Sequence, residues 1–254
     1  MDHLEAFPQV WWRQLFRVEG DDASIGMAHP LSSCVQSRIV EWLYRSQEAC
    51  KFSNASLHLA VFILIKFCRL IQSSNLRSSH NLKKYTIASL MLATKYEESQ
   101  SLAKKVWKYC TAGTRICIDE LLSSERDILS TLQFNISTPT TLTFLTLLWN
   151  LKAITKEVQQ LSASFAHETL RRLPPTTRRP SLIAICCLFI AIYLAAEAPG
   201  SVGMQLKYFI EQNSSYSVEE VSAGIRELTN CLNTNYGNGS ATKVARSTPS
   251  MHTT

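Results

Sequence analysis

The chain has 254 residues, a formal net charge of +6, 46% hydrophobic residues and 18% charged residues. This composition allows a sizeable core, and the length suits one large domain or two of about 100 residues each. Only 8 glycines and 8 prolines occur, which argues against an all-β fold, because such folds need turn residues every few positions.

The first predicted element is a short amphipathic helix from Phe7 to Val18, which must dock on another part of the molecule. We expect one of its two neighbouring tryptophans, Trp11 and Trp12, to pack on a bundle and the other to face a partner. Residues 1–5 lack the pattern of a signal peptide. The later uncharged run Leu182–Ala196 is shorter than the ~20 residues that span a bilayer. We therefore expect a soluble intracellular protein.

A first set of helices follows this element, with Ser53–Asn54 as the expected cap of its second helix. The third helix of the set is almost uncharged from Ile87 to Thr94, which indicates a helix buried on all sides. The predicted helices of this set lie at about 35–50, 57–71, 81–97, 103–110 and 118–132.

A second set repeats this pattern. Ser137–Pro139 resembles a helix start, with proline tolerated in the first turn. Helices are predicted at 141–151, 155–173, 181–196, 203–211 and 218–233. Its third helix is again wholly apolar, and aligning Ala93 with Ala191 places Tyr193 opposite Lys95.

The repeat predicts an all-α fold of two tandem five-helix bundles, each around a buried central helix, with an N-terminal helix. The predicted boundaries are 1–32 for the N-terminal helix and linker, 33–136 for the first bundle, 137–235 for the second, and 236–254 for a flexible tail.

Lys95 ends the buried helix of the first bundle, where a charge is unfavourable unless its ammonium reaches water or a carboxylate. A lysine at a helix C-terminus also interacts favourably with the helix dipole, by about 0.3–1 kcal/mol. Since the equivalent position of the second bundle is Tyr193, the architecture does not require the lysine. We expect Glu125 to be its partner and the pair to bind another protein.

Other chemistry receives little support from the sequence. The eight cysteines include no CxxC pair, so they resemble small apolar residues rather than a disulfide frame or zinc site. The four arginines between 171 and 179 form the densest basic patch, which is more typical of a solvated loop than of a nucleic-acid contact. No Gly-rich phosphate loop, HExxH or GxSxG motif occurs. We therefore predict no catalytic residues, no cofactor and no metal.

Three segments resemble the cyclin box in order, spacing and residue type: Ser56–Val61, Ala93–Glu98, and Glu125–Leu129 with Leu132 and Phe134. The resemblance runs from about Val35 to Trp149, and the second half resembles the weaker C-terminal cyclin fold. In detail the sequence resembles a gammaherpesvirus cyclin, because the box starts near the N-terminus and we see no acidic, Pro-rich degradation tail and no LxCxE motif.

Cyclins bind a cyclin-dependent kinase and activate it by holding its C-helix inward and moving its activation loop, without doing chemistry themselves. The resemblance implies that Lys95 and Glu125 form the centre of the kinase contact. Leu92, Tyr96, Leu129, Phe134 and Ile136 match positions that pack on the kinase helix. Glu97 and Glu98 match acids that approach arginines of the kinase loop.

The resemblance also implies a docking groove for RxL peptides, with Ile39, Trp42, Leu82 and Lys83 at matching positions. However, Val35–Ile39 replaces the Met-Arg-Ala-Ile-Leu of many cyclins, and the family's Asp-Arg-Phe is replaced by Ile65–Phe67. An arginine and an acid that usually pair are thus both lost, which puts docking through this groove in doubt. Trp42 on an apolar face fits a core position equally well.

The resemblance therefore predicts a non-catalytic viral cyclin that drives cell-cycle progression in the host nucleus and cytoplasm. The implied partner is a host cyclin-dependent kinase, either cyclin-dependent kinase 2 or a close cell-cycle relative, with no membrane or direct nucleic-acid contact. The alternative is a transcription-type adaptor of the same two-bundle fold that binds DNA or polymerase factors. Such an adaptor would need a continuous basic face and usually has a zinc ribbon, and neither feature is evident in the sequence.

Overall fold

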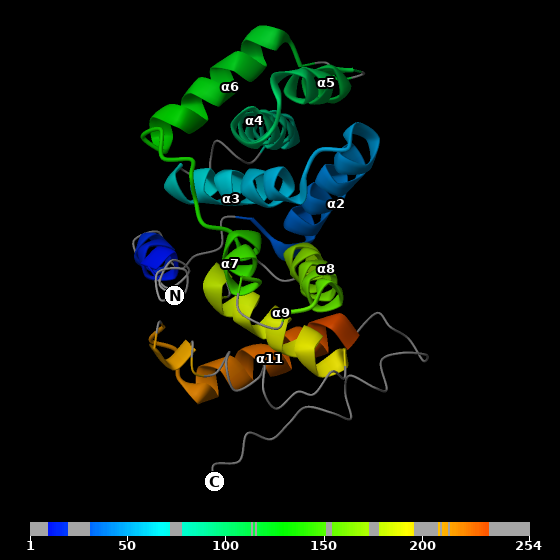
Figure 1. The fold of residues 1–254 in the computed structure, drawn as a ribbon. Coiled ribbons are helices and arrows are strands. Elements are labelled where there is room, and N and C mark those ends of the chain that lie inside the picture. The colour runs from blue at the N-terminus through cyan, green and yellow to red at the C-terminus, as the bar shows by residue number, and fades with distance from the viewer. Residues whose placement is uncertain are drawn as a thin grey trace. The chain divides into compact units, whose positions relative to one another are not determined.

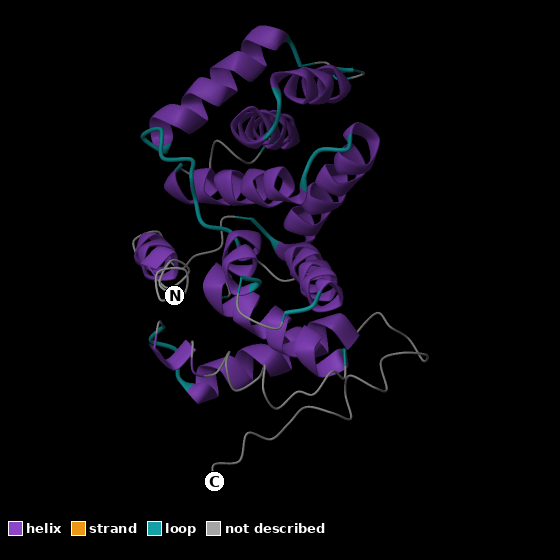
Figure 2. Ribbon diagram, in the orientation of Figure 1, coloured by secondary structure: helices purple, strands orange, loops and turns teal. Residues whose placement is uncertain are grey.

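A computed structural model describes residues 10–19, 31–71, 78–112, 114, 116–150, 154–172, 178–195, 208, 210–212 and 214–233. All regular elements among these residues are helices, which confirms the predicted all-α fold (Figure 2). The chain divides into two compact units. The first unit comprises Asp21–Thr140 with Pro174–Thr176, and the second comprises Met1–Gly20, Thr141–Leu173 and Thr177–Thr254.

Three helices of the first unit begin at serine caps. Ser32, Ser53 and Ser99 each accept a hydrogen bond from the backbone N–H three residues further on. A side-chain oxygen in this position satisfies one of the N–H groups that have no partner within the helix. The cap predicted near Ser53 is therefore confirmed. The helices are α2 (Ser33–Cys50), α3 (Asn54–Leu70), α4 (Ser79–Glu97), α5 (Gln100–Thr111) and α6 (Ile118–Thr131).

Helix α4 is the centre of the first unit. It packs against α3, α5 and α6, and Figure 1 shows it nearly end-on with these helices around it. Every residue from Thr86 to Thr94 is buried, as the apolar run predicts. The last turn of α4 reaches the surface, where Lys95 and the two residues after it are exposed. The core helix therefore delivers its terminal side chains to solvent.

Helix α9 (Pro180–Leu194) has the same role in the second unit, where it packs against α7 (Thr141–Leu148), α8 (Lys156–Arg172) and α11 (Val218–Asn233). Residues 181–188 are all buried. Gly224 of α11 allows a close approach to α9, because a Cβ at this position would lie 2.7 Å from Cys186 Sγ. A side chain there would require either the Cys186 side chain or the helices themselves to shift.

Two details of the second set differ from the prediction. Helix α7 starts at Thr141, so Pro139 precedes the helix rather than lying in its first turn, in keeping with the extended backbone that proline favours in the residue before it. The helix also ends at Leu148 rather than at residue 151. Of the predicted helix at 203–211, residues 208, 210 and 211 are described and helical. The predicted tail at 236–254 lies outside the described residues.

The helix at 10–19 belongs to the second unit. Trp12 is fully buried and its ring packs edge-on against Phe144, with ring centroids 5.0 Å apart. Trp11 is 43% exposed, so the two tryptophans differ in burial as expected, and a partner for Trp11 stays a prediction. Glu19, also buried, accepts a hydrogen bond of 2.8 Å from the backbone N–H of Ser181 and thereby caps the first turn of α9.

The eight cysteines are all free thiols, and five of them are buried. Burial raises the pKa of the Cys68 thiol to about 12 and that of Cys187 to about 12, so these groups stay protonated and pack as apolar residues. This confirms the predicted role for the buried cysteines. Among the described helices, none is both long enough and apolar enough to cross a membrane.

Candidate protein-binding site

Lys95 and Glu125 form an ion pair at the surface of the first unit. Lys95 lies in the last turn of α4, and Glu125 lies in the second half of α6. The Nζ atom of Lys95 is 2.7 Å from both carboxylate oxygens of Glu125. The side chain of Glu125 is 8% exposed, whereas that of Lys95 is 47% exposed. The pairing predicted from the sequence is therefore present, with the carboxylate of Glu125 nearly buried and the ammonium of Lys95 half-exposed to water.

This pair has the chemistry to bind a partner's main chain. A lysine ammonium has three N–H donors, and two of them are directed at Glu125, which leaves one for another acceptor. The carboxylate oxygens can accept further hydrogen bonds. The pair is neutral as a whole, so it suits a backbone C=O and N–H better than a charged side chain.

Two exposed aromatic residues lie in the sequence close to the pair. Tyr96, the residue after Lys95, is 54% exposed, and Phe134, just beyond α6, is 72% exposed. Aromatic side chains are enriched at the centres of protein interfaces. Their rings are therefore available to a partner that binds near the pair.

The backbone at the end of α6 is strained. Gln133 and Phe134 have φ angles of 50° and 59°, in the left-handed region that side chains disfavour by roughly 1–2 kcal/mol per residue. The turn is held by a hydrogen bond of 2.8 Å from Phe134 N–H to the carbonyl of Leu129. Together with a hydrogen bond of 3.1 Å from Gln133 N–H to the carbonyl of Ser130, this is the pair of contacts that commonly ends a helix. The left-handed residues therefore terminate α6, and the turn leaves the Phe134 ring exposed.

The other apolar residues of the predicted site differ in exposure. Leu129 and Ile136 are half-buried. Leu92 is only 6% exposed and belongs to the core of the unit, so it packs inside the unit rather than at the surface of the site. Sequence reasoning missed Ile118 and Leu122, which are 56% and 38% exposed on α6. Their spacing of four residues, continued at Leu129, marks one face of a helix, and this periodicity was available in the sequence.

The two predicted acids have different environments. Glu97 is mostly exposed, but partial desolvation of its carboxylate and, second, the charge of the neighbouring Glu98 raise its pKa. Glu98 instead accepts hydrogen bonds from Ser53 N–H at 2.7 Å and Ser56 Oγ at 2.6 Å. It thereby ties the end of α4 to the start of α3. Burial works to raise the pKa of Glu98, but these hydrogen bonds outweigh it and hold the pKa below its ordinary value.

The four residues of the predicted RxL groove come from two helices. Ile39 and Trp42 lie on α2 and are half-buried. Leu82 and Lys83 lie near the start of α4, where Leu82 is half-buried and Lys83 is exposed. Trp42 is therefore neither a fully buried core residue nor a freely exposed one.

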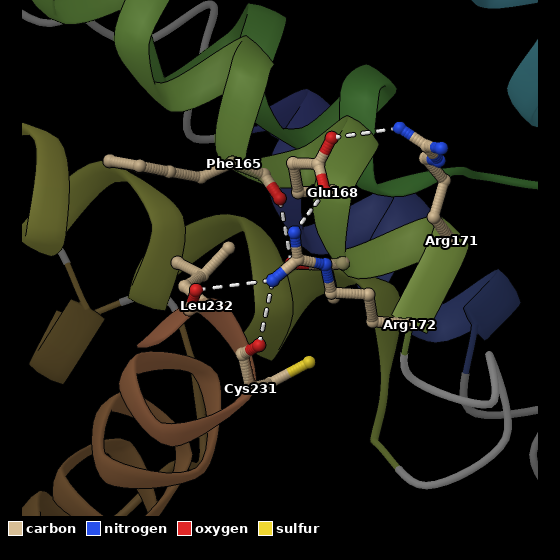
Figure 3. A network of polar contacts seen from close by, with 7 residues as sticks. Phe165, Glu168, Arg171, Arg172, Cys231 and Leu232 are labelled. Carbon is tan, nitrogen blue, oxygen red and sulfur yellow. Dashed lines mark hydrogen bonds and ion pairs between the residues drawn. The ribbon is translucent and has the colours of Figure 1, made fainter. Parts of the chain in front are cut away.

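The basic cluster of the second unit makes contacts within that unit (Figure 3). Arg172 donates hydrogen bonds of 2.9 and 3.1 Å to the carbonyls of Cys231 and Leu232 at the end of α11, where helix carbonyls lack partners. It also lies 2.9 Å from Glu168, which in turn lies 3.2 Å from Arg171. Arg172 therefore joins α8 to α11, whereas the ion pair of Arg171 with Glu168 lies within α8.

The remaining two arginines of the cluster are also engaged. Arg178 Nε lies 2.7 Å from a carboxylate oxygen of Glu227 on α11. The guanidinium of Arg179 stacks over the ring of Phe16 at 5.8 Å from its centroid. The cluster thus holds α11 and the helix at 10–19 in place, which is a structural use of its charge.

Comparison with known proteins gives related matches. Residues 21–137 match the family described as cyclin, N-terminal domain. The chain is 24% identical over 212 residues to cyclin-A1-1 of Arabidopsis thaliana, which covers 82% of this chain and 44% of that protein. It is 26% identical over 208 residues to the G2/mitotic-specific cyclin-B3 of Mus musculus, covering 80% of this chain and 14% of that protein.

Among solved structures, the fold is similar to the X-ray structure of a viral cyclin from herpesvirus saimiri, with a TM-score of 0.67 and 16% identity. The match covers 86% of this chain and 96% of the viral chain. At this identity the likeness concerns the fold alone. The chain spans less than half the length of the two curated relatives named above.

The fold and these matches first define a class, that of all-helical proteins built from cyclin-type bundles. Residues 21–137 match the cyclin N-terminal domain, so this part of the chain is similar to the cyclin family.

Proposed function

We propose that this chain is a regulatory subunit that binds and activates a cyclin-dependent kinase. Similarity to cell-cycle cyclins and to the fold of a viral cyclin supports this function. At the finer level, we propose a viral cyclin of the gammaherpesvirus type, as in murine gammaherpesvirus, which acts in the host nucleus and cytoplasm and drives cell-cycle progression. The proposed partner is cyclin-dependent kinase 2 or a close cell-cycle relative.

The Lys95–Glu125 pair is the observation that carries this proposal. An ion pair with two 2.7 Å contacts lies on the same unit as exposed Tyr96 and Phe134. The pair supplies directional hydrogen bonds, and the aromatic residues supply apolar area to bury, which is the usual composition of an interface centre. The half-buried and exposed leucines and isoleucine of α6 extend this apolar area along the helix.

In this proposal the chain contributes no catalytic group. A kinase is active when the lysine of its third strand pairs with the glutamate of its C-helix and its activation loop is in place. A partner that binds the inward position of the C-helix more tightly than the outward one shifts the population toward the active state. Lys95, Glu125 and the exposed aromatics would bind the kinase backbone near that helix.

The test mixes the full chain with monomeric cyclin-dependent kinase 2 phosphorylated on its activation loop. We expect a heterodimer in gel filtration and an increase in histone-kinase activity. The variant Lys95→Ala with Glu125→Ala should weaken the complex while leaving helix content unchanged. The matched control removes another pair from the same unit, Glu41 and Arg45, which lie 3.3 Å apart on α2. If the chain bound no cell-cycle kinase, the proposal would be refuted.

The adaptor alternative finds no specific support. A DNA-binding face needs basic side chains available to phosphates, and the densest basic cluster is used in contacts between α8, α11 and the helix at 10–19.

A further inference from the structure

The ammonium of Lys95 has a second neighbour besides Glu125. Its Nζ atom lies over the indole ring of Trp107, at 5.6 Å from the ring centroid. A cation within about 6 Å of an aromatic centroid is attracted by the negative face of the ring, and tryptophan gives the strongest such attraction. Lys95 of α4 is therefore contacted by a carboxylate from α6 and by an indole from α5.

The helix that carries Trp107 is firmly fixed in the first unit. Val106 and Cys110 of α5 are 0% and 2% exposed and anchor it in the core. The ammonium of Lys105 donates a hydrogen bond of 3.0 Å to the carbonyl of Cys50, which ties α5 to the end of α2. The indole is itself half-buried. It is therefore presented to Lys95 from a rigid element rather than from a loop.

A lysine on its own is poorly suited to a directional role. Its side chain has several rotatable bonds, and its compact ammonium is strongly hydrated. The carboxylate of Glu125 fixes the distance of the ammonium, but a second contact from another helix limits the directions from which the side chain reaches it. A partner then binds a lysine that is already ordered, and less conformational entropy is lost on binding.

We propose that Trp107 is a positioning residue that holds the Lys95 ammonium in the orientation used for partner binding. Trp107 acts through Lys95 and needs no contact with the partner itself. The consequence for affinity rests on the proposed kinase contact, whereas the positioning is a property of the free chain. The two parts are therefore tested separately.

The first experiment measures the Hε protons of Lys95 by NMR in the free chain. Protons above an aromatic face are shifted upfield, so we expect an upfield Lys95 Hε signal that moves to the ordinary lysine position in Trp107→Leu. Trp107→Phe, which keeps a ring, should retain part of the shift. Tyr109→Leu, an exposed aromatic of the same helix, is the control and should leave the signal in place. An ordinary Hε position in the unaltered chain would overturn the proposal.

The second experiment is a double-mutant cycle on kinase affinity, measured by calorimetry with phosphorylated cyclin-dependent kinase 2. Trp107→Leu should weaken binding about two- to five-fold, the range of a cation–π contact at an exposed site. In the Lys95→Met background the same change should have no further effect, because its target is absent. An equal loss in both backgrounds would mean that Trp107 acts independently of Lys95 and would overturn the proposal. If the unaltered chain bound no kinase, the proposed function would fail, and the NMR result alone would decide the positioning.

Discussion

Replacing Lys95 should destabilise the first unit more than replacing Glu125, although the two side chains form a single ion pair. The reason is their unequal burial, since the side chain of Glu125 is 8% exposed and that of Lys95 is 47% exposed. Lys95→Met leaves a nearly buried carboxylate without its cation. Glu125→Gln leaves an ammonium that water can solvate, next to a neutral amide that can still accept a hydrogen bond.

The magnitude lies between two measured limits. Exposed ion pairs contribute about 0–1 kcal/mol, whereas removing one partner of a fully buried pair costs about 3–5 kcal/mol. Because Lys95 is half-exposed, solvent screens the pair, and we expect Lys95→Met to lower the free energy of unfolding by about 1–2 kcal/mol. Glu125→Gln should lower it by less than about 1 kcal/mol.

Urea unfolding of the full chain measures the overall loss, and native-state hydrogen exchange of the α4 and α6 amides assigns it to the first unit. The double variant Lys95→Met with Glu125→Gln should be more stable than Lys95→Met alone, because it leaves no unpaired charge. The reasoning is refuted if Glu125→Gln is the more destabilising single change, or if the two losses simply add.

Three further predictions concern other parts of the chain. Gly224→Ala should destabilise the second unit by about 1–3 kcal/mol through overpacking against α9. Adding Cys186→Ala should recover most of the lost thermal stability. An unchanged melting temperature for Gly224→Ala would contradict the close contact between Gly224 and Cys186. Hydrogen bonds from α3 hold the pKa of Glu98 below its ordinary 4.5 despite burial, so its contribution to stability should be complete above pH 4.5 and disappear as the pH falls through the lowered value. Glu98→Ala should remove that part of the pH profile in urea titrations. An unaltered profile would show that the hydrogen bonds from Ser53 and Ser56 to Glu98 do not stabilise the fold. RxL peptides should bind poorly in calorimetry because Val35 and Gln36 stand at the positions of the usual methionine and arginine, and tight binding would show that the groove functions without them.

The fold could be predicted because its strongest signals are local. An uncharged run such as Ile87–Thr94 can be satisfied only by burial on all sides, and the second run at 182–192 repeats the pattern. Caps such as Ser53 depend on residues three positions apart and are equally local. The Lys95–Glu125 pair could be predicted for a different reason, since a lysine at the end of a buried helix needs a carboxylate or water.

The rest of the site depends on contacts that no local pattern specifies. Glu98 resembles its neighbour Glu97 in the sequence, yet it reaches back to Ser53 and Ser56, more than 40 residues earlier. The left-handed backbone of Phe134 has no signal, because glycine or asparagine is the usual residue for that conformation. Side chains that meet only after helices pack, such as Lys95 and Trp107, also become visible only in the structure.

The two central helices show which features of the site the architecture does not need. Both α4 and α9 bury an apolar run and bring their last turn to the surface, where α4 carries Lys95 and α9 carries Tyr193, 39% exposed. A bundle can therefore end its central helix without a charge. In the first unit the ammonium of Lys95 contacts the nearly buried carboxylate of Glu125 on α6 and the indole of Trp107 on α5. Because removing the lysine alone would leave that carboxylate unpaired, Lys95 and Glu125 are energetically coupled, and a pair that the bundle does not need is consistent with the proposed binding role.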